Sequence, residues 1–341
     1  MQNYPLRKDM NMKQTARIGT LVSAVIVTVL VCTMSSCNPD KRQRPSNIDS
    51  KTVKFMVIAD IHHGYLEDVN KRLQVILDQA KQEENVDFII QLGDFILDPT
   101  KSKSGNFMEL WNSFKGPKYH VLGNHDMDLT DKAQVRALWG MPANYYSFAL
   151  EGFRFIVLDG NHIKHGEDKY IDYENSNYYT HEGKRGYFGL KQLKWFKEQL
   201  ASTDLNVVVF SHQRLSDKTD GADMKKAIDD ANTKAGFGKV ILSLNGHGHR
   251  DRSELINNVP YVEIPTAAHK WDGKAIPYTT VRFAVINLDP KGAVEINGRS
   301  VEFDYQNKGI GEFAEGDIKD KSFRFVPKSK PSTSPSQPGA R

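Results

Sequence analysis

Hydrophobic positions in the first half of the chain alternate between short, mainly apolar runs and helical periodicity. Runs at 53–59, 88–92 and 119–122 have the length and composition of buried strands. Between them, apolar residues recur every three or four positions in 69–80 and in 107–114, which is typical of amphipathic helices. This alternation predicts an α/β body with a largely parallel sheet.

The second half of the chain contains more strands. Two apolar segments, 145–150 and 153–158, flank Glu151-Gly152 and predict a hairpin. Helical spacing then follows in 190–200, and apolar runs predict strands at 207–210, at 240–244 and, with turn residues between them, from 259 to 304. No internal repeat or linker interrupts this body, so we expect residues 51–310 to form one domain.

Composition excludes several classes of protein. With 39% hydrophobic and 26% charged residues among 341, the chain can bury a core and is neither disordered nor fibrous. The formal net charge of +4 arises mostly from residues 1–36, which carry +3, so the remainder is nearly neutral. Bulk charge therefore gives no reason to expect a nucleic-acid partner.

The N-terminus has the pattern of an export signal. Basic residues precede an apolar stretch at 18–31, and small residues then lead to Cys37. An uncleaved membrane anchor is the alternative, since the stretch is near the shortest length that spans a bilayer. The two cysteines are Cys32, inside the stretch, and Cys37, so cleavage before Cys37 would leave one unpaired thiol at the first mature position.

Residues 34–37, Met-Ser-Ser-Cys, resemble the lipobox of bacterial lipoproteins, with Met where Leu is usual. The resemblance implies that residues 1–36 are a lipoprotein-type signal peptide and that Cys37 is lipidated. Residues 37–50 are polar and are expected to be a tether. The body would then be held at the membrane of a bacterial cell envelope, outside the cytoplasm. Residues 311–341 are expected to be a C-terminal extension, disordered from about 327, where Pro and Ser dominate.

Polar residues with metal-binding chemistry follow five of the predicted strands. The clusters are Asp60-x-His62, Gly93-Asp94, Gly123-Asn124-His125-Asp126, His212 and Gly246-His247-x-His249. Carboxylate and amide oxygens together with imidazoles suit Zn, Mn or Fe(II). Each cluster alone is unremarkable, since one Gly-Asp is usually a turn and one His after a strand is usually a hydrogen-bonded rim residue. All five at strand ends predict a site for two metal ions.

The ordered series of clusters resembles the signature of the calcineurin-like metallophosphoesterases over residues 53–285. The resemblance implies two mixed β-sheets sandwiched together and flanked by helices in four layers, with the metals at the strand ends. Carried over position by position, one metal would be held by Asp60, His62 and His249, the other by Asn124, His212 and His247, and Asp94 would bridge the two.

The same resemblance implies the chemistry. Two divalent ions, Mn, Zn, Fe or a mixture, would hold a bridging hydroxide that attacks phosphorus. His125 cannot easily bind a metal alongside Asn124, so it is expected to face the substrate and to stabilise charge or protonate the leaving oxygen. Asp126 is expected to orient His125, or else to be a structural turn residue. Purple acid phosphatases in the same superfamily carry a metal-binding Tyr a few residues after the Gly-Asp pair. Here Gly93-Asp94 is followed by Phe95-Ile96, which offers no phenolate oxygen, and this disfavours an Fe(III) site.

Substrate contacts are predicted from the surroundings of these motifs. The segment 161–188 is long, polar and aromatic, so it is either a substrate lid or a surface excursion. The candidate substrate-binding residues are His63, Asn161, Tyr187, His269 and Trp271. His63 either lines the site beside His62 or points away from it.

Taken together, the residues favour a dinuclear metal-dependent phosphoester hydrolase of the cell envelope that acts on a small phosphorylated substrate. A phosphodiester or nucleotide pyrophosphate is the preferred substrate, and a phosphomonoester is the alternative. A non-catalytic metal-binding envelope protein would be expected to have lost metal ligands or His125, and all are present. A dinuclear hydrolase of a non-phosphate bond is the remaining alternative.

Overall fold

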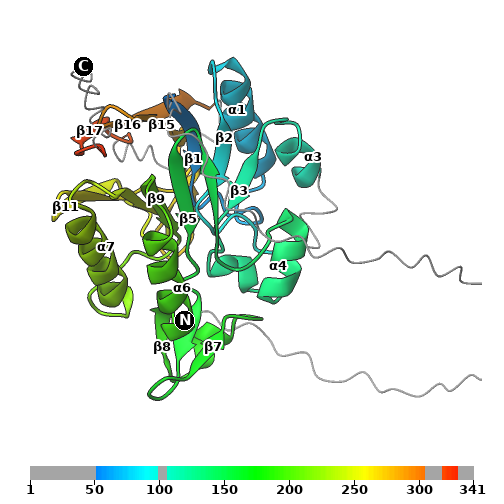
Figure 1. The fold of residues 1–341 in the computed structure, drawn as a ribbon. Helices are drawn as coiled ribbons and strands as arrows, with labels where there is room; N and C mark the ends of the chain where they lie inside the picture. Colours follow the sequence, from blue (N-terminus) through cyan, green and yellow to red (C-terminus); the bar gives the residue numbers. More distant parts are fainter. Residues whose placement is uncertain (1–50, 99–105, 304–316, 329–341) are drawn as a thin grey trace, which may run out of the picture. The chain divides into compact units, whose positions relative to one another are not determined.

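Two six-stranded β-sheets pack against each other in the computed structural model of the protein, which describes residues 51–98, 106–303 and 317–328 (Figure 1). The first sheet contains, in spatial order, β17 (Lys321–Arg324), β16 (Ala293–Glu302), β15 (Thr280–Asp289), β1 (Val53–Ile58), β2 (Phe88–Gln91) and β3 (Lys118–His120). The second contains β11 (Arg252–Ile256), β12 (Val259–Glu263), β10 (Val240–Asn245), β9 (Asn206–Ser211), β5 (Phe153–Val157) and β4 (Tyr146–Leu150).

Both sheets are mixed. In the first, β1, β2 and β3 are parallel, whereas β15, β16 and β17 continue the sheet as antiparallel strands. In the second, β5, β9, β10 and β12 are parallel and the edge strands β4 and β11 are antiparallel. The predicted 145–158 hairpin is thus confirmed as β4–β5, and the two mixed sheets expected from the family resemblance are present.

Strand alternation explains how β1 supports two cores at once. Successive side chains of a strand point to opposite faces of the sheet. Phe55 and Val57 accordingly lie in the core between the two sheets, while Met56 and Ile58 lie in the core on the outer face of the first sheet. Because both faces are buried, all residues of the strand except Lys54 are apolar.

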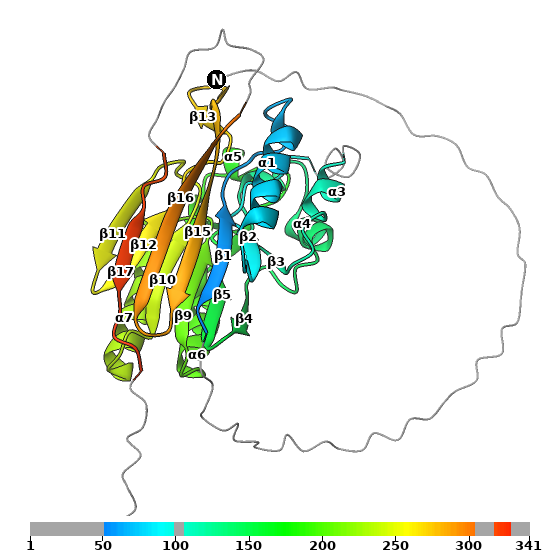
Figure 2. The same ribbon diagram turned by 90° about the horizontal axis from the view of Figure 1, so that it is seen from above.

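Helices cover the outer face of each sheet and complete four layers (Figure 2). The outer core of the first sheet includes residues of α1 (Val69–Gln82), α3 (Phe107–Trp111) and α4 (Lys132–Trp139). That of the second sheet includes residues of α6 (Leu190–Ala201) and α7 (Gly221–Ala235). The sequence pattern did not predict α7, because its buried side chains are few and partly small: Met224, Ala227 and Ile228 beside Gly221.

The segment 161–188 has regular secondary structure instead of being a long loop. It contains a three-stranded sheet in the order β7 (Tyr170–Asp172), β6 (His162–Lys164), β8 (Lys184–Tyr187), and the short helix α5 (Asn177–Thr180). Two further strands, β13 (His269–Trp271) and β14 (Ala275–Pro277), form a small hairpin. Figure 2 shows α5 and β13 towards the same end of the two sheets.

The domain extends beyond its predicted end at residue 310. Strand β17 pairs with β16, and Ile318 is buried in the core between the sheets. The boundary was wrong because β17 is a four-residue edge strand, Lys-Ser-Phe-Arg, whose single apolar residue gives a weak signal. Residues 1–50 and 329–341, including the signal, Cys37 and most of the low-complexity end, lie outside the described residues. Within the described part, no helix is both long and apolar enough to cross a membrane.

Candidate metal centre

The predicted ligand residues lie in the loops that leave the carboxyl ends of the parallel strands. Asp60 follows β1 and Asp94 follows β2, and the two loops are joined by backbone hydrogen bonds from Asp60 N to Gly93 O (3.2 Å) and from His62 N to Asp94 O (3.0 Å). The second sheet is joined to them by His212, after β9, whose Nδ1 donates to the carbonyl oxygen of Leu92 at 2.8 Å. The strand ends of both sheets therefore meet at one place.

Five of the seven predicted metal ligands have left-handed backbone conformations. The φ angles are 52° at Asp60, 49° at His62, 51° at Asp94, 69° at His247 and 57° at His249. A positive φ is uncommon outside glycine, and each such residue costs on the order of 1–3 kcal/mol. The surrounding fold holds these strained conformations, which turn the side chains towards one another.

Two glycines allow the loops to approach closely. A Cβ atom on Gly123 would lie 1.9 Å from the backbone nitrogen of Asp94 and 2.2 Å from its Oδ1 atom. Gly93 has a φ of +96°, and a Cβ atom there would lie 2.5 Å from Nδ1 of His212. Any side chain at either position would push the loops apart.

Asp60, His62 and His249 form one group of potential ligands, with one donor atom from each within 4.8 Å of the others. Nε2 of His249 lies 3.3 Å from Oδ1 of Asp60. Nδ1 of His62 is 2.9 Å from the carbonyl oxygen of Asp60, to which it donates, so its Nε2 carries the lone pair. That Nε2 is buried and makes no hydrogen bond within the described residues, as expected of a metal-binding atom.

A second group consists of Asp94, His212 and His247. Nε2 of His212 lies 3.1 Å from Oδ2 of Asp94, 3.1 Å from Nδ1 of His247 and 3.1 Å from Oδ1 of Asn124. Since Nδ1 of His212 donates to a backbone carbonyl, its Nε2 is again the atom available to a metal. Asn124 therefore joins this group through its amide oxygen.

Asp94 lies between the two groups. Its Oδ2 atom is 3.4 Å from Nε2 of His62, a member of the first group, and 3.1 Å from Nε2 of His212, a member of the second group. Burial raises the pKa of Asp94, but the neighbouring His212 and His125 hold it well below its usual value. An ionised carboxylate in this position fits the bridging role, and the carboxylate, amide and imidazole donors around it fit divalent first-row metals. The seven individual ligand assignments stay predictions.

His125 lies at the edge of the same centre. Its ring centroid is 5.3 Å from that of His62, and a donor atom of His125 lies within 4.8 Å of donor atoms of His62 and Asp94. Its Nδ1 atom is 2.8 Å from Oδ2 of Asp128. Burial lowers the pKa of His125, and the charges of Asp94 and Asp128 raise it to a net value above its usual one.

The prediction that Asp126 orients His125 is wrong. The buried Asp126 carboxylate instead accepts hydrogen bonds from the backbone nitrogens of Gly123 (2.8 Å), Phe95 (2.8 Å) and Ile96 (2.9 Å). His125 begins a 3₁₀ turn, η1 (His125–Met127), and in such a turn the residue three positions along lies over the first. Asp126 therefore fastens two ligand loops together, which is the structural alternative.

Asp128, which the sequence motifs did not indicate, connects His125 with the 161–188 segment. Its Oδ1 atom accepts hydrogen bonds from the hydroxyl of Tyr178 at 2.5 Å and from that of Ser176 at 3.2 Å. The hydroxyl of Tyr179 is 3.4 Å from Nδ1 of His125. Part of the predicted lid thus contacts the metal centre directly through α5, while its function as a lid stays a prediction.

Of the predicted substrate contacts, the structure places His269 and Trp271 beside the centre. The His269 ring is fully buried, with its centroid 5.0 Å from that of His62 and 5.7 Å from that of His249. Trp271, two residues further along β13, is half-exposed, and its ring lies 5.3 Å from that of Tyr65.

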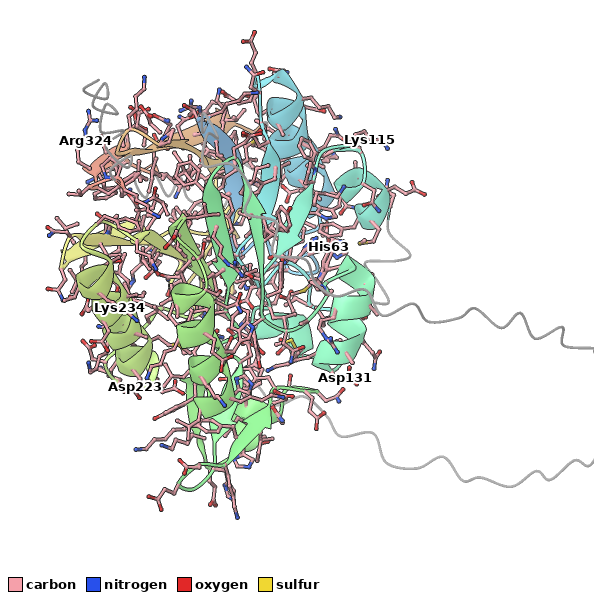
Figure 3. All side chains as sticks on the ribbon, viewed as in Figure 1. His63, Lys115, Asp131, Asp223, Lys234 and Arg324 are labelled. Carbon is pink, nitrogen blue, oxygen red and sulfur yellow. The ribbon has the colours of Figure 1, made fainter. Side chains whose placement is uncertain are left out.

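The side chains of His63 and Asn161 contact other parts of the protein. The His63 ring packs against Phe107 of α3 with centroids 4.3 Å apart, as its place beside the helices suggests (Figure 3). Asn161 is fully buried, and its Nδ2 atom donates to the carbonyl oxygen of Leu122 (2.6 Å) and to Asp159 Oδ1 (2.9 Å). Its Oδ1 atom accepts from Gln213 at 2.5 Å, so internal partners engage both ends of the amide.

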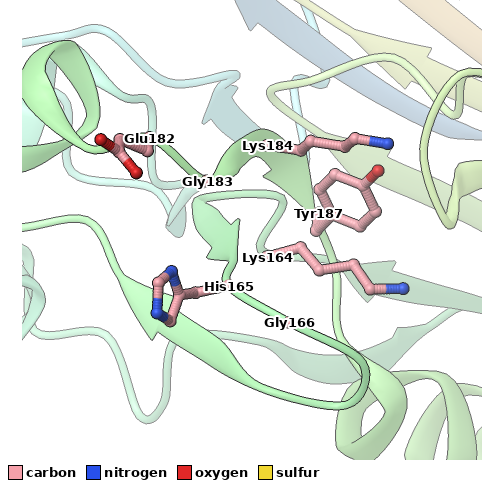
Figure 4. Close-up of a pocket in the computed structure, with 7 residues that line it drawn as sticks. All are labelled: Lys164, His165, Gly166, Glu182, Gly183, Lys184 and Tyr187. Atoms are coloured by element: carbon pink, nitrogen blue, oxygen red, sulfur yellow. The ribbon is translucent and has the colours of Figure 1, made fainter.

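Tyr187 lies in a different place. It lines a pocket of about 450 Å³ on the three-stranded sheet (Figure 4). The other lining residues are Lys164, His165, Gly166, Glu182, Gly183 and Lys184. None of the seven predicted metal ligands borders this pocket, so Tyr187 is not brought to the metal centre.

One other cluster has the residue types of a metal site. Asp159, His162 and Asp172 offer donor atoms within 4.8 Å of one another. The buried ammonium of Lys132 fills the space between them, 2.6 Å from Oδ2 of Asp159 and 2.7 Å from Oδ1 of Asp172. The cluster is therefore an ion-pair network that fastens α4 to the 161–188 segment.

Comparison with known proteins identifies the class. The profile of the calcineurin-like phosphoesterases matches residues 53–251, more than half of the chain, so the chain belongs to this family. The two adjoining groups of carboxylate and imidazole donors at the strand ends are able to hold metal ions.

Two curated plant proteins are similar to part of the chain. The manganese-dependent ADP-ribose/CDP-alcohol diphosphatase of Arabidopsis thaliana is 27% identical over 132 residues, which cover 32% of this chain and 42% of the relative. The protein of the same name from Oryza sativa subsp. japonica is 28% identical over 128 residues, covering 31% of this chain and 40% of the relative. The match thus spans less than half the length of these relatives.

Solved structures share the fold at low sequence identity. A dimetal phosphatase from Danio rerio superposes with a TM-score of 0.58 at 16% identity, over 80% of this chain and 98% of that one. GAP50 of Plasmodium, described as the anchor in the inner membrane complex, superposes with a TM-score of 0.52 at 14% identity, over 82% and 90% of the two chains. These likenesses confirm the architecture.

Proposed function

We propose that the protein hydrolyses the phosphodiester or pyrophosphate bond of a small nucleotide-like substrate. The observation that carries the proposal is the place of His125, held by Asp128 at the edge of two adjoining groups of metal-binding side chains. The names of the two curated relatives, both diphosphatases, support a pyrophosphate substrate. The aromatic side chains of α5 next to His125 support a substrate larger than a simple phosphomonoester.

The residues of the chain would have two roles, holding the metal ions and acting on the leaving oxygen. When bound, the two metal ions supply Lewis acidity towards phosphate oxygens and lower the pKa of water. Asp60, His62 and His249 would hold one ion, with Asp94 as the shared carboxylate. His125 has its Nδ1 engaged by Asp128, so its Nε2 is the nitrogen that can stabilise or protonate the leaving oxygen.

A substrate panel tests this function directly. The metal-loaded full chain should be assayed with ADP-ribose, a CDP-alcohol, an aryl phosphodiester and an aryl phosphomonoester, each with Mn, Zn, Co and Ni. We expect the highest kcat/KM for a pyrophosphate or diester. If aryl monophosphates are hydrolysed at least ~100-fold better than every diester and pyrophosphate, the protein is a phosphomonoesterase, a difference of about 2.7 kcal/mol in activation free energy.

His125 is tested by its replacement. His125→Ala should leave both metals bound and lower kcat by about 10²- to 10⁴-fold, the usual contribution of a positioned acid or base. The loss should be smaller for a nitrophenolate leaving group, which needs no proton. Equal losses for good and poor leaving groups would assign His125 to charge stabilisation instead.

We further propose that the protein works at the bacterial cell envelope, anchored through a lipidated Cys37. The support comes from the sequence, in which an apolar stretch at 18–31 precedes the lipobox-like residues 34–37. Cys37→Ser should block processing and leave the full-length precursor in the membrane fraction. Intact-mass measurement should find an acyl-modified N-terminal Cys37 in the wild type, and its absence would favour the uncleaved anchor.

A further inference from the structure

A series of aromatic rings extends outward from the first group of metal ligands. The Tyr65 ring stacks on that of His62, with centroids 4.9 Å apart and planes 8° apart. Trp271 follows, with its ring centroid 5.3 Å from that of Tyr65 and a plane angle of 32°. Through Tyr65, a predicted metal ligand is in ring contact with a residue at the surface.

Trp271 is unusual among the tryptophans because half of its surface is exposed. Its relative exposure is 50%, whereas Trp111 and Trp139 are buried at 1% and 8%. The ring lies at the end of β13, in the hairpin formed with β14, where Trp271 pairs with Ala275. Such a ring offers a flat apolar face close to a catalytic centre, and stacking on aromatic side chains is how proteins commonly bind nucleobases.

His269, on the same strand, provides a polar group next to these rings. It is fully buried, and neither of its ring nitrogens has a hydrogen-bond partner within the described residues. Its ring lies edge-on to that of Tyr65, with centroids 5.8 Å apart and planes at 84°. A buried polar group without a partner is costly, so its place beside the centre indicates that a bound molecule supplies the partner.

We propose that Tyr65, Trp271 and His269 form a subsite for a nucleobase of the substrate, beside the metal group of Asp60, His62 and His249. Trp271 provides the stacking face, Tyr65 positions that face against His62, and His269 bonds a polar atom of the bound nucleotide. This inference rests on the proposed function, which supplies the nucleotide-like substrate whose phosphodiester or pyrophosphate bond is hydrolysed. The binding of the base itself requires no hydrolysis and can be measured separately.

The test compares two phosphate monoesters that differ in the base, AMP and ribose 5-phosphate. Their Kd values are measured by calorimetry on the manganese-loaded full chain. Trp271→Ala should weaken AMP binding by about 5- to 100-fold, the usual effect of losing a base-stacking side chain, and change the Kd of ribose 5-phosphate less than ~2-fold. Trp271→Phe retains an aromatic face and should recover most of the affinity.

Controls separate this subsite from general effects. Leu255→Ala removes an exposed apolar side chain of β11 and should change neither Kd. His269→Phe keeps a ring and should weaken AMP binding by about 2- to 10-fold through the lost hydrogen bond. AMP should also quench the fluorescence of the wild type more than that of Trp271→Phe, because Trp271 is the indole in contact with the base.

The outcomes distinguish the two proposals. Equal changes for both ligands in Trp271→Ala, or no change in either, would overturn the subsite. It would equally be overturned if Tyr179→Ala, in α5 beside His125, removed the preference for AMP while Trp271→Ala did not. If base-dependent binding is lost in Trp271→Ala but no diester or pyrophosphate is hydrolysed, the subsite stands and the proposed function fails.

Discussion

Replacing Asp128 isolates the contribution of a residue that holds His125 without touching the predicted metal ligands. Its Oδ2 atom is 2.8 Å from Nδ1 of His125, and its Oδ1 accepts the Tyr178 hydroxyl at 2.5 Å. Hydrogen bonds to a charged group contribute about 1.5–3 kcal/mol. If the bond to His125 persists in the transition state, Asp128→Ala should lower kcat by about 10- to 150-fold.

Two further variants calibrate this magnitude. Asp128→Asn retains an oxygen that can accept from Nδ1, so it should recover part of the lost activity. Tyr178→Phe removes one of the two donors to Oδ1, together with a 3.4 Å contact to Nδ2 of Asn124, and leaves both Ser176 and the contact between Oδ2 and His125 in place. Its effect on kcat should therefore be at most about 5-fold, the equivalent of a neutral hydrogen bond.

The assay measures kcat and KM on manganese-loaded protein with two diesters, one with a nitrophenolate and one with an alkoxide leaving group. A positioning role predicts a lower kcat with KM within about 3-fold of the wild type, and a larger loss for the alkoxide. Elemental analysis should find the metal content unchanged. An Asp128→Ala enzyme with wild-type kcat on both substrates, or with less bound metal, would refute the reasoning.

Three other changes have defined outcomes. Asp94→Asn should abolish activity and lower bound metal by about half or more, because a neutral amide bridges poorly; elemental analysis showing full metal content with retained turnover would contradict the bridge. Lys132→Met leaves the buried Asp159 carboxylate without its cation, which should cost about 3–5 kcal/mol and lower Tm by about 5–15 °C in calorimetry; an unchanged Tm would show that the network adds nothing. Truncation after residue 310 removes β17 and exposes the edge of β16, so light scattering should detect more aggregation than in the full chain.

The strands of the central layers could be predicted closely from the sequence. The run at 53–59 corresponds to β1 (Val53–Ile58) and that at 240–244 to β10 (Val240–Asn245), because both strands are buried on both faces and are therefore mainly apolar. Elements that depend on tertiary packing were missed. The strands of 161–188 and β17 have few apolar residues, so their pairing is decided by neighbours distant in the sequence.

The candidate site was predictable where its chemistry lies in short motifs at strand ends. Parallel strands bring those ends together, so the motifs gave the residues of both ligand groups. Asp128 and Tyr65 lack such a signal. The direction of a loop side chain is set by the packing around it, which is why His63 points to Phe107 although it adjoins His62.

The left-handed conformations at Asp60, His62, Asp94, His247 and His249 have a consequence for how the protein could change under selection. Glycine adopts such conformations freely, so replacing any of these residues with glycine relieves strain while discarding a donor atom. Catalysis and heat resistance therefore compete at the same positions. A population of variants selected only for survival at high temperature should lose this centre before it loses the sheets that support it.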